Sequence, residues 1–256
     1  PGTFRQLRRL VAATPSDLML PSWADLKAEP VTAAQMMGLS ERGHLPVMND
    51  LDRMRYAVSC GVDLSGLSRA GVAITFLARD ADGRKFPLEV HRGAYGVAQI
   101  VAIIEDAYQR GIQPGIVIVE NNGVQDLVVQ VIASARRANG EACAWAGRVV
   151  GFTTGRQKTD PQLGLPALDV EIANGVFHWP GAEAWRDESP NALAWRTLEN
   201  EMASLLRFSP RGKTPDGPMS FWFAWSGLER VSVNGAFHGK PTTVNVSKRT
   251  ELEAAF

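Results

Sequence analysis

The sequence has few cysteines and no excess of charge of either sign. Its 256 residues include two cysteines, and Lys plus Arg equals Asp plus Glu at 27 each. Cys60 and Cys143 stand far apart without metal-ligand spacing, and Cys60 falls in an apolar run, so we expect both to be reduced core residues of a cytosolic protein. Because the net charge is zero, binding to a polyanion must depend on local basic patches, which argues against a tight DNA-coating protein.

Long apolar runs and nucleotide-binding or zinc-binding motifs are also missing. No stretch approaches the roughly 20 apolar residues of a membrane-spanning helix, so we expect no membrane insertion. The triplet at 212–214 resembles the end of an ATPase phosphate loop, but Arg207 stands where that motif needs its first glycine. The four histidines have no metal-ligand spacing. The first residues lack an initiator Met and a signal-peptide pattern, and we expect a cut or processed end.

The chain divides into three regions by composition. Residues 1–55 are interrupted by proline and glycine and are expected to be a linker or the trailing part of a missing domain. Residues 56–234 carry regular apolar periodicities, which predict one folded domain. Residues 235–256 are polar and are expected to form a C-terminal tail.

The periodicities predict an α/β domain. Strands at 56–63, 71–79 and 85–91 form an antiparallel three-strand meander, followed by a helix that ends near Gly111 and a buried strand that ends at Glu120. A helix at 124–138 leads to a fifth strand at 148–152. Further on we expect a helix to Asn174, a short strand at 176–179, and helices at 191–206 and 216–230. This order predicts a ribonuclease H-like fold, a mixed five-stranded sheet with three antiparallel and two parallel strands, flanked by helices.

Acidic residues end two of the predicted strands. Asp63 ends the first strand, and Glu120 ends the run at 116–119, which is apolar on both faces and is therefore typical of a central strand. A carboxylate at the end of such a strand is costly unless it is paired or bound to a cation. The two strand ends therefore favour a site for a divalent metal.

Five segments in sequence order carry a resemblance to a known family. They are Tyr56 to Gly66 with Asp63, Val117-Ile-Val-Glu-Asn-Asn-Gly123, Val150-Gly-Phe-Thr-Thr-Gly-Arg-Gln-Lys158, Leu198-Glu-Asn-Glu-Met202 and Thr214-Pro-Asp-Gly-Pro-Met-Ser-Phe-Trp-Phe-Ala-Trp225. Together, over about residues 56–231, they resemble the nuclease domain of the terminase large subunit of tailed bacteriophages. Each segment alone is weak, and the specificity lies in the ordered set.

The resemblance implies an endonuclease that cuts concatemeric double-stranded viral DNA during genome packaging, in the cytoplasm of the infected bacterial host. It implies two Mg²⁺ or Mn²⁺ ions and, by matching motif positions, Asp63, Glu120 and Asp216 as their ligands. Its implied partners are double-stranded DNA, the terminase ATPase domain that normally precedes the nuclease, the small terminase subunit and the portal. Membranes are not among them.

Each acid also has a structural interpretation. Asp63 would cap the turn at Ser65, Glu120 would form a salt bridge, and Asp216 would be the N-cap of the last helix. The chain departs from the family at Asp216, which stands between Pro215 and Gly217 where many relatives carry paired acids. It also departs in the first hairpin, where many relatives carry an extra Asp and this chain has an Arg-Ala-Gly sequence at 69–71. Candidates for an outer-shell acid are Asp169, Glu171 and Glu201.

Basic residues in two loops are candidates for contacts with DNA phosphates. They are Arg156, Lys158, Arg211 and Lys213, and the alternative for each is a solvated loop charge. Two rival functions stay open. One is a Holliday-junction resolvase or transposase-like nuclease of the same fold, and the other is a non-catalytic module that docks DNA or the portal.

Overall fold

A five-stranded mixed sheet forms the centre of the chain. The computed structural model describes residues 48, 50–64, 71–122, 125–137, 139–179, 190–204 and 215–231. The strands are β1 (Ala57–Asp63), β2 (Val72–Arg79), β3 (Lys85–Gly93), β4 (Ile116–Glu120) and β5 (Val149–Phe152), in the order β3-β2-β1-β4-β5. The first three pair antiparallel, whereas β1, β4 and β5 pair parallel. This is the ribonuclease H-like sheet, and the predicted fold class is confirmed.

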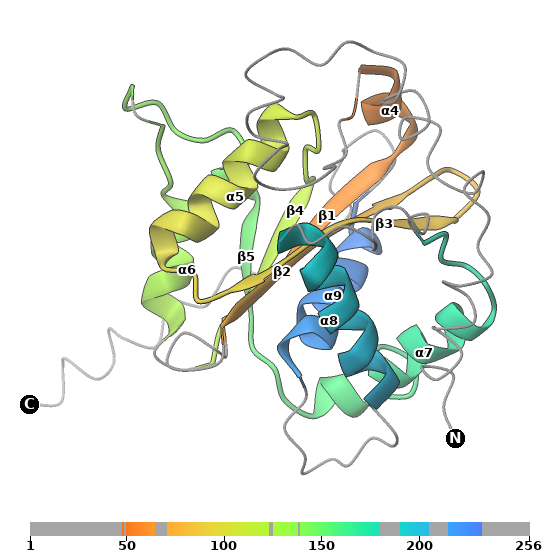
Figure 1. Ribbon diagram of the computed structural model, residues 1–256. Helices are drawn as coiled ribbons and strands as arrows, with labels where there is room; N and C mark the ends of the chain where they lie inside the picture. Colours follow the sequence, from red (N-terminus) through yellow and green to blue (C-terminus); the bar gives the residue numbers. More distant parts are fainter. Residues whose placement is uncertain are drawn as a thin grey trace, which may run out of the picture.

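Helices cover both faces of the sheet (Figure 1). α5 (Val97–Gln109) and α6 (Asp126–Ala133) pack on one face, and α4 (Asp50–Arg55) precedes β1. α7 (Leu165–Ala173), α8 (Pro190–Ser204) and α9 (Asp216–Leu228) lie on the other face. Two short 3-10 helices, η4 (Ala146–Arg148) and η5 (Arg156–Thr159), flank β5. In the described ranges, no helix is both long and apolar enough to cross a membrane.

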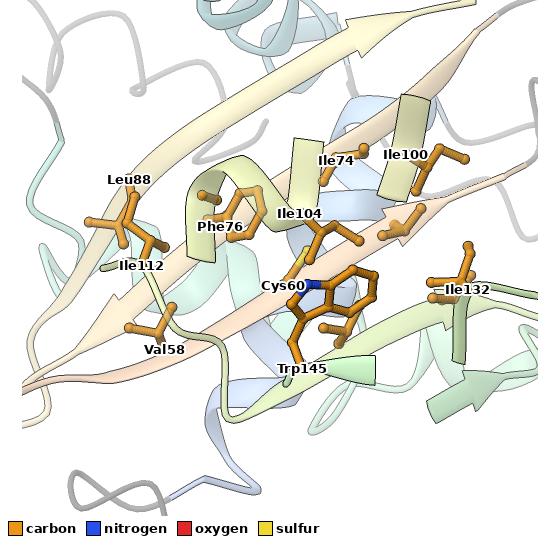
Figure 2. Close-up of a cluster of buried hydrophobic side chains, with 14 of the residues drawn as sticks. Val58, Cys60, Ile74, Phe76, Leu88, Ile100, Ile104, Ile112, Ile132 and Trp145 are labelled. Carbon is orange, nitrogen blue, oxygen red and sulfur yellow. The ribbon is translucent and has the colours of Figure 1, made fainter. Parts of the chain in front are cut away.

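Alternation along β1 divides its side chains between two hydrophobic cores. Val58 and Cys60 point toward α5, and Figure 2 shows Cys60 close to Ile104 and Trp145. Burial raises the pKa of the Cys60 thiol well above its usual value, so this cysteine is an inert core residue, as predicted. The alternate residues of β1, including Gly61, face α9.

α9 crosses the sheet in close contact with β1. The Ser59 hydroxyl donates to the Ala224 carbonyl at 2.5 Å, and the hydroxyls of Thr75 and Ser220 are 2.8 Å apart. A Cβ atom at Gly61 would lie 2.1 Å from the Ser220 carbonyl oxygen, so only glycine permits this approach. Two residues along a strand span about the same distance as four along a helix. Two more residues along β1 and four residues back along α9 therefore bring the first turn of α9 to the end of β1. The predicted return of the last helix across the sheet is confirmed.

Three predicted elements differ in detail. The strand predicted at 176–179 is a single bridge between Phe177 and Lys85, with none of the ladder that extends a strand. α6 ends at Ala133 instead of continuing to 138, because the chain turns and Arg136 bridges Ala142. β3 continues to Gly93, two residues beyond its predicted end.

The predicted N-terminal linker and C-terminal tail fall mostly or wholly outside the described residues. Of the linker, Met48 is buried, and its backbone N–H donates to the Arg110 carbonyl at 2.9 Å. A side chain at Gly111, where φ is +87°, would collide with the Met48 carbonyl at 1.8 Å. Residue 48 therefore belongs to the packed structure around α5.

Candidate metal centre

Asp63 and Glu120 end neighbouring parallel strands. Val62 pairs with Val119 in the ladder between β1 and β4, so the next residues, Asp63 and Glu120, lie side by side at its end. Alternation directs both toward the α9 face, because Gly61 contacts α9 and Ile118 packs in the core under α9. The two residues are 1% and 5% exposed. The structure thus brings two buried carboxylates together at one edge of the sheet.

The Glu120 carboxylate is held by one of its two oxygens. Its Oε1 accepts hydrogen bonds from Asn122 Nδ2 at 2.7 Å and from the Thr154 hydroxyl at 3.3 Å. Asn122 in turn accepts from the Thr154 backbone N–H at 3.1 Å, so the loops after β4 and β5 fix each other. Glu120 Oε2 is buried and has no hydrogen-bond partner among the described residues. A buried carboxylate oxygen in this state costs free energy that a cation would recover.

Asp216 lies at the start of α9 and contacts Arg92. It is 2% exposed, and its Oδ2 is 3.4 Å from Arg92 Nη2. The interpretation of Asp216 as an N-cap is wrong, because the N-cap position falls on Pro215 and Asp216 is the first helical residue. A carboxylate in the first turn still interacts favourably with the helix dipole.

Glu201, in the last turn of α8, completes a cluster around Arg92. Its Oε1 is 2.8 Å from Arg92 Nη2, and its Oε2 accepts the Gly217 backbone N–H at 3.0 Å. Burial raises the pKa of Glu201, and the negative charge of Asp216 adds to this, against the opposing effects of Arg92 and the Gly217 N–H. Glu201 is thus a predicted outer-shell acid that does contact the start of α9. Glu171 is engaged elsewhere and accepts from Lys85 Nζ at 2.6 Å and Trp225 Nε1 at 2.7 Å.

The donor atoms fit a hard divalent cation only in part. Carboxylate oxygens are the ligands that Mg²⁺ and Mn²⁺ prefer, and Asp63 and Glu120 offer them from adjacent strands. Across the described residues, however, no group of three or more His, Cys, Asp or Glu side chains is arranged to hold a metal ion. In this conformation Asp216 is close to Arg92, and the three-acid metal site stays a prediction.

The predicted DNA-contact residues are only partly described. Arg156 and Lys158 lie in η5, just after β5, on the segment that follows the Glu120-binding Thr154. Lys158 is half-buried. Arg211 and Lys213 lie outside the described residues. A role for any of the four in DNA binding stays a prediction.

Sequence reasoning missed Arg92 and Thr154. Arg92 lies just beyond the predicted end of the third strand, and β3 runs in the same direction as β1, so its end reaches the same edge of the sheet. The signal that would have found both residues is their position. Polar side chains just after strands that share a direction converge at one edge, whatever their residue type.

No protein-family model and no curated protein matches the chain. Among solved structures, the chain is similar to a human cytomegalovirus terminase nuclease domain, Mn soaked and inhibitor bound, with 12% identity, 77% of this chain and 94% of that chain covered, and a TM-score of 0.42. It is similar to the large terminase nuclease of thermophilic phage G20c, with 15% identity, coverage of 74% and 95%, and a TM-score of 0.43. It is also similar to the yeast mitochondrial Holliday junction resolvase Ydc2, with 11% identity, coverage of 66% and 78%, and a TM-score of 0.38. These likenesses concern the fold and not the activity.

Proposed function

We propose that the chain is a metal-dependent endonuclease that cuts concatemeric double-stranded viral DNA during genome packaging. The observation that carries the proposal is the buried pair of strand-end carboxylates, Asp63 and Glu120, with Glu120 Oε2 lacking a hydrogen bond among the described residues. Two buried like charges side by side are costly, and a divalent cation is the partner that offsets them best.

In the proposed mechanism, the residues of the site would have distinct roles. Asp63 and Glu120 would hold Mg²⁺ or Mn²⁺, with Asp216 as the third ligand that the family resemblance implies. Ions held there would lower the pKa of a water and stabilise charge on the phosphate oxygens. Asn122 and Thr154 hold Glu120 Oε1, which keeps this carboxylate in one orientation and leaves Oε2 for a ligand.

The proposed substrate and partners follow from the same resemblance. Arg156, Lys158, Arg211 and Lys213 would contact phosphates and position the duplex without reading its sequence. The packaging ATPase domain, the small terminase subunit and the portal would be the protein partners, in the cytoplasm of the infected host. The balance of 27 basic against 27 acidic residues favours a nuclease that is delivered to DNA by such partners.

Cleavage of supercoiled plasmid tests the proposal. We expect nicking or cutting with Mn²⁺ or Mg²⁺ and none with a chelator, and we expect Asp63→Asn and Glu120→Gln each to abolish it. Both variants should keep the fold, with a melting temperature equal to or slightly above that of the wild type in chelator, because each removes a like charge from a buried pair. Cleavage that survives chelation would refute the metal mechanism, and loss of folding in both variants would favour a structural role.

The rival functions give different results in the same assay. A Holliday-junction resolvase would cut a four-way junction at concentrations that leave linear duplex of the same sequence intact. A non-catalytic docking module would bind DNA but cut neither substrate at any metal concentration. We expect cutting of linear duplex without preference for the junction.

A further inference from the structure

Arg92 bridges two acids at unequal distances. Its Nη2 atom is 2.8 Å from Glu201 Oε1 and 3.4 Å from Asp216 Oδ2. Charged hydrogen bonds of this kind are usually about 2.7–2.9 Å long, so the bond to Glu201 is fully formed and that to Asp216 is weak. The Asp216 side chain is 3% exposed, and an ionised carboxylate so buried is stabilised by a nearby cation. Arg92 is close enough to supply that charge without binding Asp216 tightly.

Glu201 connects the arginine to the backbone at the start of α9. Its Oε2 accepts the N–H of Gly217, the residue that follows Asp216. A Cβ atom at Gly217 would lie 2.4 Å from Glu201 Oε2, so this contact depends on glycine. One carboxylate therefore fixes the first turn of α9 and also holds the guanidinium that faces Asp216.

Resting on the proposed function, we propose that Arg92 is a built-in counter-cation for Asp216, and that a divalent ion recruits Asp216 by leaving Arg92 wholly to Glu201. Before metal binds, Arg92 neutralises Asp216. When metal binds, the ion takes over that charge and Arg92 keeps its shorter contact with Glu201. Arg92 and Glu201 are then positioning residues that set metal affinity without touching the metal.

The alternative is a purely structural clamp, in which Arg92 ties β3 to α8 and α9. The two interpretations differ in the sign of their effects on metal binding. Removing a clamp loosens α9 and weakens metal binding, whichever partner is removed. Removing a competing counter-cation strengthens metal binding, whereas removing the acid that receives it weakens metal binding.

Calorimetric titration of the full chain with Mn²⁺ separates these interpretations. We expect Arg92→Gln to lower the Kd for Mn²⁺ by roughly threefold to tenfold, and Glu201→Gln to raise it by a similar factor. The amide oxygen introduced by Glu201→Gln still accepts the Gly217 N–H, so the effect of this variant reports charge and not position. When Arg92→Gln is also present, the factor by which Glu201→Gln raises the Kd should be at least about threefold smaller, because no arginine is left for Glu201 to hold.

Two control variants sharpen the titration. Arg92→Lys keeps the charge and should stay within about twofold of the wild-type Kd. Arg79→Gln removes an arginine that pairs with Glu229 near the opposite edge of the sheet, and should leave the Kd unchanged. Weaker binding in both Arg92→Gln and Glu201→Gln would overturn the proposal in favour of the clamp.

A second measurement needs no metal. In chelator, a double-mutant cycle of Arg92→Gln and Asp216→Asn should show a coupling in unfolding stability that the matched cycle of Arg79→Gln and Asp216→Asn lacks. Zero coupling would overturn the counter-cation proposal even if the wild type binds Mn²⁺. If the coupling is present but the wild type binds no Mn²⁺, the proposed function fails and the exchange with metal fails with it.

Discussion

At the scale of the residue, buried acids in the described part of the chain are satisfied in different ways. Glu89 is fully buried and pairs with Arg110 Nη1 at 2.6 Å and with His91 Nε2 at 2.7 Å. Glu120 is nearly as buried, but its hydrogen-bond partners are an amide and a hydroxyl. Among the described residues, Glu89 has a cationic partner, whereas Glu120 is held by neutral groups. This contrast supports a bound cation at the sheet edge.

The pairing of Glu89 predicts a pH dependence of stability. Burial alone would raise the pKa of Glu89, but the charge of Arg110 and the hydrogen bond from His91 outweigh it and lower the pKa to about 2. Because the folded pKa lies below the unfolded value of 4.5, the stabilisation is present above pH about 5 and is lost as the pH falls toward 2. Urea unfolding should show a loss of roughly 3 kcal/mol across that window. Glu89→Gln should flatten this dependence of the unfolding free energy on pH. An equally steep dependence in the variant would contradict the assignment of the loss to Glu89.

Single residues were predicted unevenly. The positions of Asp63 and Glu120 were predictable because each ends a recognisable strand, and the ladder brings them together, whereas their role as metal ligands stays a prediction. The environment of Asp216 was not predictable, because it depends on Arg92 and Glu201, which lie 124 and 15 residues away in sequence and meet only in the fold. Spacing along a chain carries no signal for contacts of that separation.

At the scale of the element, the position of α9 depends on Gly61. The helix was predicted to cover a sheet face because its aromatic residues are too apolar to stand free, and they are indeed buried. The strand predicted at 176–179 was wrong because its apolar residues pack under α9 while only one bridge to Lys85 forms. Apolar periodicity reports burial, and it does not report how many backbone pairs a segment forms with a neighbouring strand.

Gly61→Ala tests the contact between β1 and α9. The new Cβ would lie 2.1 Å from Ser220 O and 2.4 Å from Ala224 N, and both are backbone atoms that cannot rotate away. We expect a loss of at least about 1–3 kcal/mol of unfolding free energy, measured by chemical denaturation. Gly147→Ala is the matched control, since among the described residues, apart from its chain neighbours, no atom lies within 4 Å of its Cβ position, and it should be neutral. A neutral Gly61→Ala would mean that α9 does not pack as described.

At the scale of the whole molecule, the ends of β1, β3 and β4 and the start of α9 meet at one edge of the sheet. That edge carries the acids and lies next to η5 with Lys158. The fold class and this convergence were predictable from the order of the elements. Arg211 and Lys213 fall in 205–214, outside the described residues, and a phosphate contact by any of the four predicted basic residues stays a prediction.

DNA binding should be weak and strongly salt-dependent, because the chain has no net charge and must rely on local cations. Lys158→Ala should weaken binding by a similar factor on unrelated duplex sequences and reduce the slope of log K against log salt by about 1. Fluorescence anisotropy measures both. Arg84→Ala removes an exposed charge from the turn between β2 and β3 and should change neither. An effect of Lys158→Ala on one sequence only would place this side chain at a base edge.

The central claim is that the strand-end carboxylates bind a divalent cation. A crystal of the wild-type chain grown with Mn²⁺ and measured near the manganese absorption edge tests it most directly. We expect an anomalous peak in contact with the Asp63 and Glu120 carboxylates, including Glu120 Oε2, and its absence in Asp63→Asn. If Asp216 joins, a second peak about 3.5 to 4 Å from the first is expected. A peak elsewhere, or none at saturating Mn²⁺, would contradict the claim.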